Sequence, residues 1–206
     1  MRRWCKNPRV STPVFRAYIQ AGLAVLSQSR RAIARATLWA IGRGLVRLDT
    51  LSDLTRADFH RVRRDLLKDG VRIGADEFVH LHDRNTGASR AIKGVLDGYQ
   101  WDDRIYVAEG LSPRRLAAVL VHEVNHVVNA SEENYRGSRA LLREEYRALY
   151  AERLLAGTPM TAARCLALKQ SLIHNYGIHG VTPSDVPDVP PGRFYPTGAG
   201  RVTLAG

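Results

Sequence analysis

The sequence has few cysteines, and this limits the kinds of site that it can form. Cys5 and Cys165 are the two cysteines among 206 residues. Two cysteines do not make the disulfide framework of a small secreted domain, and they lack the paired spacing of a structural zinc site. We therefore expect a protein of a reducing compartment, folded around a hydrophobic core that a chain of this length is able to bury.

Long apolar runs are also missing. No stretch of about eighteen apolar residues occurs, so the sequence predicts no membrane-spanning helix. The basic N-terminus is not followed closely by an apolar segment with a small-residue cleavage site, so no Sec-type signal peptide is expected. The sequence favours a cytoplasmic protein or one delivered by a specialised secretion system.

Acidic residues are absent from Met1 to Leu48, a stretch with ten basic residues. Residues 1–72 hold sixteen Lys and Arg and five acids, so the whole net charge of +11 lies there, and residues 73–206 sum to zero. A solvated basic helical surface is the favoured interpretation. Contact with an anionic membrane or a nucleic acid through residues 1–72 is the next, and an organelle-targeting segment ranks last.

The hydrophobic pattern predicts an α+β fold that is mainly helical. Helical spacing recurs over 15–26, 38–48 and 56–69, and later over 113–128, 138–156 and 158–174. Short strands are expected at Glu77–His82, Ala91–Leu96 and Arg104–Ala108, giving a small sheet of about three strands. We divide the chain into a basic helical region (1–72), a core (73–180) and a Gly/Pro-rich tail (181–206).

The clearest chemical signal is His122-Glu123-Val124-Asn125-His126, on a helix expected to start at Ser112-Pro113. Histidines four residues apart leave the same face of a helix, where both imidazoles are able to bind one Zn²⁺. Glu123 lies about 100° around the helix, next to the metal but not on it. It is the candidate general base for a water that the metal activates.

These residues resemble the HExxH signature of the zincin metallopeptidases. The resemblance covers roughly residues 100–156 and implies a compact zincin core with an active-site helix pair. It also implies that the preceding strand, Arg104–Ala108, binds extended substrate by edge pairing. Small domains of this kind are similar to bacterial effectors, toxin domains and regulatory proteases.

A catalytic zinc site needs a third protein ligand, and three glutamates are candidates. Glu145 is favoured because eighteen residues separate it from His126, which resembles the HExxH-x18-E spacing of gluzincins. Its neighbours three and four positions away are all apolar, and a carboxylate on such a stripe needs a cation or a partner. Glu144 has Arg147 beside it, so we expect a surface or supporting role. Glu132 occupies the place of the third metzincin histidine, without that family's glycine.

Several other residues are weaker candidates. His174, Tyr176 and His179 follow the last predicted helix and are candidates to stabilise a transition-state oxyanion. Glu152 is expected either to support a histidine ligand or to form a surface ion pair. Asn129 is expected to cap the motif helix, with a hydrogen bond to a ligand residue as the alternative.

The sequence therefore predicts a zinc-dependent endopeptidase that cleaves a protein or peptide substrate. The proposed ligands are His122, His126 and Glu145, with Glu123 as the catalytic base and Zn²⁺ as the cofactor. A bacterial effector or toxin is one hypothesis for its role. The alternative is a non-enzymatic, metal-stabilised module that binds membrane or nucleic acid through its basic N-terminal helices.

Overall fold

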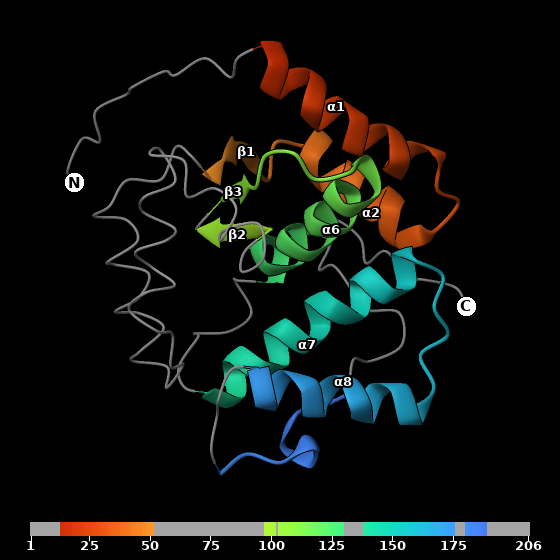
Figure 1. Ribbon diagram of the computed structural model, residues 1–206, viewed down its shortest axis with the longest axis vertical. Helices are drawn as coiled ribbons and strands as arrows, with labels where there is room; N and C mark the ends of the chain where they lie inside the picture. The colour runs from red at the N-terminus through yellow and green to blue at the C-terminus, as the bar shows by residue number, and fades with distance from the viewer. Residues whose placement is uncertain (1–12, 52–96, 102, 130–137, 176–179, 189–206) are drawn as a thin grey trace, which may run out of the picture.

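Helices pack against a small mixed sheet in the computed structural model, which describes residues 13–51, 97–101, 103–129, 138–175 and 180–188 (Figure 1). The described part is mainly helical, which confirms the predicted α+β class. Its elements are, in chain order, α1 (Pro13–Gln28), α2 (Ala32–Gly42), β1 (Arg47–Thr50), β2 (Gly98–Trp101), β3 (Arg104–Val107), α6 (Pro113–Asn129), α7 (Ser138–Leu155), α8 (Ala162–Asn175) and the short 3-10 helix η3 (Pro183–Asp185).

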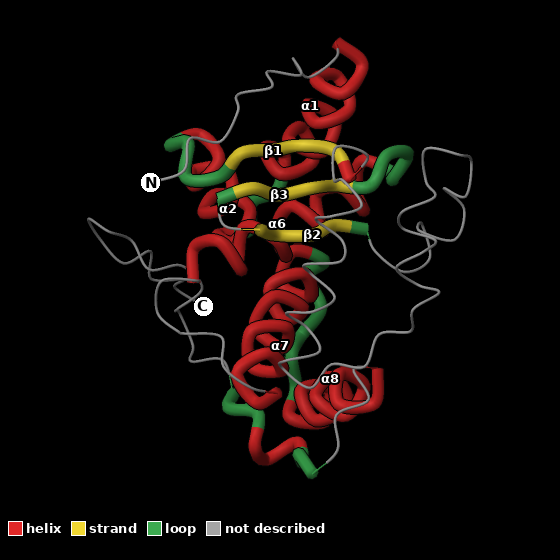
Figure 2. Tube along the Cα trace, turned by 90° about the vertical axis from the view of Figure 1, so that its left-hand side faces the viewer, coloured by secondary structure: helices red, strands yellow, loops and turns green. Residues whose placement is uncertain are grey.

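The sheet has the strand order β1-β3-β2, with β1 parallel and β2 antiparallel to β3 (Figure 2). The predicted strand at Arg104–Ala108 is confirmed as β3, but its expected place at the edge is wrong, because β3 is hydrogen-bonded on both sides. In β2, which the sequence did not predict, Gly98 pairs with Val107. The strands expected at Glu77–His82 and Ala91–Leu96 and the helix expected at 56–69 lie outside the described residues.

The two N-terminal helices pack on α6. The buried face of α1 approaches α6 so closely that a Cβ added at Gly22 would lie 2.7 Å from Cγ of Leu116. Helix α2 does not continue to Leu48 as predicted. It ends at Gly42, and Gly44 has a φ of +69°, a conformation that glycine adopts without a steric penalty. The chain then turns into β1, which contains Leu48.

The loop that leads into α6 is fixed by a single tyrosine. The hydroxyl of Tyr18 donates a hydrogen bond to the carbonyl of Ala108 (2.7 Å) and accepts one from the backbone N–H of Leu111 (3.1 Å). The hydroxyl of Ser112 then accepts the N–H of Arg115 at 3.2 Å. The predicted Ser112-Pro113 helix start is thus confirmed. Tyr18 holds the loop before α6, and Ser112 caps the first turn of the helix.

Helix α7 runs beside α6, and α8 lies against α7 on the side away from α6 (Figures 1 and 2). The predicted helix over 138–156 is confirmed as α7, which ends just before Gly157, a residue with a φ of +73°. Helix α8 starts at Ala162 and not at Thr158-Pro159, because Thr161 is the residue whose carbonyl and hydroxyl accept the first helical N–H groups. Val186, in the described part of the predicted tail, is buried against Leu142, Tyr146 and Leu172.

One hydrophobic core joins the N-terminal helices to the motif helix. Buried side chains of α1, α2, β3 and α6 belong to the same cluster. The proposed boundary at residue 72 lies outside the described residues, but described segments on both sides of it share this core and the sheet. No described helix combines the length and the apolar composition that a membrane span requires.

Candidate metal centre

The structure brings His122, His126 and Glu145 together at the interface of α6 and α7. The Nε2 atoms of the two histidines lie 3.1 Å apart. Oε2 of Glu145 is 3.4 Å from Nε2 of His122, and its Oε1 is 3.5 Å from Nε2 of His126. Two ring nitrogens and a carboxylate from neighbouring helices therefore form a small triangle of possible metal ligands.

The size of this triangle fits a tetrahedral metal. With metal–ligand bonds of about 2.0–2.2 Å, neighbouring ligand atoms in a tetrahedral site are about 3.3–3.6 Å apart. The two histidine nitrogens, 3.1 Å apart, are close to that range, and each lies 3.4 or 3.5 Å from a different oxygen of Glu145. With one ligand atom taken from each residue, the three atoms lie within 4.8 Å of one another. Imidazole nitrogen and carboxylate oxygen are also the donors that Zn²⁺ accepts in catalytic sites. His122, His126 and Glu145 are thus able to hold such an ion together.

Burial and neighbouring charges act differently on the two histidines. Burial lowers the pKa of His126 to about 4, so its ring is neutral near pH 7. Burial acts in the same direction on His122, but hydrogen bonds to Glu145 and Glu152 outweigh it and raise the pKa of His122 well above the usual value. His122 is therefore held between two carboxylates, one on each side of its ring.

Glu123 faces the sheet. Its side chain is 6% exposed and packs against β2, where a Cβ added at Gly98 would lie 2.8 Å from its Oε1 and 2.5 Å from Cγ1 of Val119. Burial raises the pKa of Glu123 to about 8, an effect that the charge of His122 partly offsets. Since Gly98 is the first residue of β2, the absence of a side chain there lets the strand lie directly on Glu123.

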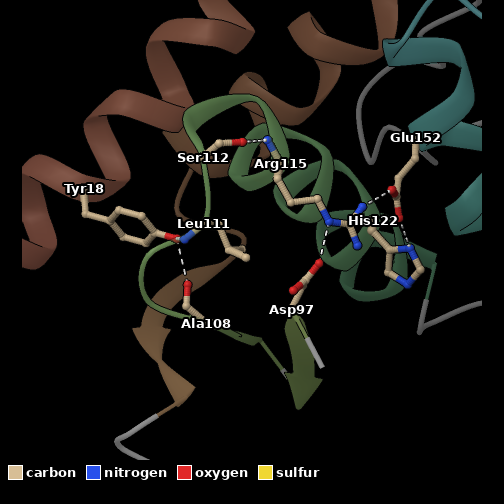
Figure 3. Close-up of polar contacts among 8 residues, drawn as sticks. All are labelled: Tyr18, Asp97, Ala108, Leu111, Ser112, Arg115, His122 and Glu152. Atoms are coloured by element: carbon tan, nitrogen blue, oxygen red, sulfur yellow. Dashed lines mark hydrogen bonds and ion pairs between the residues drawn. The ribbon is translucent and has the colours of Figure 1, made fainter. Parts of the chain in front are cut away.

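A second carboxylate supports the first histidine. Oε1 of Glu152 lies 2.8 Å from Nδ1 of His122, and its Oε2 lies 2.8 Å from Nη1 of Arg115 (Figure 3). Nε of Arg115 also contacts the carboxylate of Asp97, directly before β2. The two roles considered for Glu152, a histidine support and an ion pair, are therefore both present.

The remaining sequence candidates lie elsewhere. Glu144 is fully buried, so the surface position expected for it is wrong; Nη1 of Arg147 is 3.5 Å from its Oε1. Asn129 donates to the carbonyl of Asn125 at 2.7 Å in the last turn of α6, in agreement with its predicted capping role. His174 is exposed at the end of α8. Glu132, Tyr176 and His179 lie outside the described residues.

Sequence reasoning missed three residues of this region, namely Asp97, Gly98 and Arg115. The spacing of residues in the sequence did contain an indication for Arg115. It precedes His122 by seven residues, and Glu145 precedes Glu152 by the same number. Seven residues are two helical turns, so each pair shares a helix face, and two helices packed side by side place those faces together.

Comparisons with known proteins identify no relative of this chain. No family model, curated protein or solved structure matches the chain. What the protein does is therefore inferred from the geometry of its own residues.

Proposed function

We propose that this protein is a zinc-dependent peptidase that hydrolyses peptide bonds within a protein or peptide substrate. The observation that carries the proposal is the triangle of His122, His126 and Glu145 beside a buried Glu123. Three protein ligands are typical of a catalytic zinc site, which keeps a fourth position for water or substrate, whereas structural sites are closed by four protein ligands. Bound zinc would supply Lewis-acid chemistry, lowering the pKa of water and polarising a carbonyl.

The protein's own residues have separate tasks in this scheme. His122 and His126 offer ring nitrogens from one face of α6, and Glu145 offers a carboxylate from α7. Glu123, on another face of α6, takes a proton from the attacking water and returns it to the leaving nitrogen of the substrate. The carboxylate must be ionised for this role, and the charge of a bound metal ion would favour the ionised form against the burial that raises its pKa to about 8. Burial of Glu123 between α6 and β2 restricts its carboxylate, because the backbone of Gly98 lies directly against it.

The arrangement of base and ligands agrees better with catalysis than with a purely structural metal. In a structural site, the residue after the first histidine has no function and is free to be any helix-compatible residue. Here that residue is a glutamate kept in a buried position against the sheet, which costs free energy unless the carboxylate has a partner or a task. The base position therefore favours the peptidase over the metal-stabilised module.

The test compares wild type with Glu123→Gln, which keeps the shape of the side chain and removes its ability to take a proton. We expect the variant to keep stoichiometric zinc and to lose proteolysis by at least 100-fold, because general-base catalysis contributes about 10²–10⁴-fold. The substrate is found by sequencing the new N-termini that appear in a whole-proteome digest. Glu109→Gln, the same change at an exposed glutamate, is the matched control and should cleave as wild type does.

Two results would contradict the proposal. Full proteolysis by Glu123→Gln would show that another group acts as the base. A wild-type protein that holds zinc but generates no new N-termini, in comparison with Glu123→Gln, would favour the structural module.

A further inference from the structure

Arg115 connects the candidate metal centre to the sheet. It lies on α6, two turns before His122, and its guanidinium contacts two carboxylates at once. Nη1 is 2.8 Å from Oε2 of Glu152 on α7, and Nε contacts Oδ2 of Asp97 at the start of β2. The other oxygen of Glu152 is the one that meets Nδ1 of His122 (Figure 3). A continuous line of contacts thus runs from β2 through Arg115 and Glu152 to His122.

We propose that Arg115 is a positioning residue that holds Glu152 on His122 and ties Asp97, the residue before Gly98, to the same carboxylate. This inference rests on the zinc site of the proposed function. A carboxylate held at one oxygen only rotates about its terminal bond. The planar guanidinium fork binds the second oxygen and so fixes the plane of the Glu152 carboxylate.

The consequence for the metal follows from the two nitrogens of the imidazole. When Nδ1–H of His122 donates a hydrogen bond to Glu152, Nε2 carries the lone pair. Nε2 is also the atom of His122 that lies beside His126 and Glu145, where the metal would bind. Loss of such a supporting carboxylate typically weakens metal affinity by about 10–100-fold. Arg115 acts one step further out, so its removal should produce a loss at the lower end of this range.

The exposure of Arg115 argues against a role mainly in stability. Its side chain is 46% exposed, whereas Asp97 and Glu152 are 22% and 13% exposed. Ion pairs with so much solvent access add little to the free energy of folding, because water screens the charges and the long side chain loses conformational entropy. What the guanidinium does supply is geometry, since it spans three separate elements, namely β2, α6 and α7.

Through Asp97, Arg115 also affects the position of the catalytic base, Glu123. It directly precedes Gly98, the residue on which Glu123 packs. A movement of Arg115 would therefore release the Glu152 carboxylate on one side and the start of β2 on the other. The positions of the ligand His122 and of the base Glu123 thus both depend on Arg115, although the two residues lie on different faces of α6.

The experiment measures metal binding by the full-length chain, without any peptide substrate. Zinc affinity is determined by competition with a chromophoric chelator, and the visible spectrum of the Co²⁺ form reports the ligand geometry. For Arg115→Gln we expect about tenfold weaker zinc binding and a changed Co²⁺ spectrum. Arg114→Gln, the same change at the preceding exposed arginine, is the matched control and should leave both unchanged.

A double-mutant cycle tests whether Arg115 acts through Glu152. Because the two residues form one chain of contacts, Arg115→Gln in combination with Glu152→Gln should bind zinc no more weakly than Glu152→Gln alone. Arg115→Lys should give an intermediate loss, because an ammonium keeps the charge but does not present a planar fork. This variant also answers the question if Arg115→Gln does not fold, as judged by its melting curve.

Unchanged zinc affinity and an unchanged Co²⁺ spectrum in Arg115→Gln would overturn this inference, and so would losses that add up in the double variant. The outcomes remain distinct from those for the proposed function. A protein that binds zinc and shows the expected cycle but cleaves nothing contradicts the peptidase alone. A wild type that binds no zinc contradicts both.

Discussion

Gly98→Ala is the substitution that best separates the proposed catalytic base from the proposed metal ligands. The new Cβ would lie 2.5 Å from Cγ1 of Val119, 2.8 Å from Oε1 of Glu123 and 3.0 Å from its Cγ. Distances below 3.0 Å between these atoms require something to move. Gly98 has a φ outside the left-handed region, so alanine meets no backbone strain there, and the whole effect of the change is steric.

The size of the effect depends on which group moves to relieve the close contacts of the added Cβ. Overpacking by one methyl group costs about 1–3 kcal/mol, which a folded domain usually tolerates. Val119 and Glu123 are both buried, so neither side chain moves away freely, and relief of the 2.5 Å contact with Val119 requires β2 to shift away from α6. That shift also removes the strand from its place against the carboxylate of Glu123. A displacement of about 1 Å in a catalytic group lowers the rate by roughly 100-fold. His122, His126 and Glu145 lie on other faces and keep their separations, so zinc binding should persist.

The assay is proteolysis of the identified substrate together with zinc content measured on the same sample. We expect Gly98→Ala to lower kcat/KM by about 10–100-fold, in line with a displaced base, while zinc stays stoichiometric. Gly42→Ala is the control, because a Cβ added there meets no described atom within 4 Å. Wild-type proteolysis by Gly98→Ala would refute the reasoning, because Glu123 would then not depend on its contact with β2.

Two further predictions concern stability. Tyr18→Phe removes the hydroxyl that bridges Ala108 and Leu111, and it should lower the free energy of unfolding by about 1–2 kcal/mol in a urea titration; an unchanged midpoint would show that the loop before α6 is held by other contacts. Zinc at 100 times its Kd should stabilise the wild type by about 2.7 kcal/mol and raise its melting temperature. His126→Ala should lose this shift, and a shift that survives would place the ion elsewhere.

The sequence predicted the helices of the site well because their signals are local. Ser112-Pro113 and Gly157 mark helix ends through backbone chemistry that depends on a few adjacent residues, and both marks are confirmed. The four-residue spacing of His122 and His126 places them on one face of any α-helix. Glu145 was predicted from a spacing that resembles that of gluzincins and from its apolar stripe, and the structure places it beside both histidines.

The strands were harder to predict because pairing partners are distant in sequence. Leu48 continues a helical pattern, yet Gly44 ends α2 and β1 pairs with β3 more than fifty residues later. Asp97-Gly98 has the composition of a turn, and only the partner strand and Glu123 make it the start of β2.

The ion network was missed for a similar reason. Arg115 and Glu152 are ordinary charged residues of helical segments until α6 and α7 pack side by side. Glu144 shows the opposite error. The nearby Arg147 suggested solvent, but the arginine lies against the buried carboxylate instead.

The central claim is that His122, His126 and Glu145 hold one zinc ion, and the most direct measurement is the zinc content of purified protein. The account predicts one zinc per wild-type chain and loss of the ion in Glu145→Ala, because the variant keeps both histidines but lacks the carboxylate 3.4 and 3.5 Å from them. Stoichiometric zinc in Glu145→Ala, or no zinc in the wild type, would contradict it.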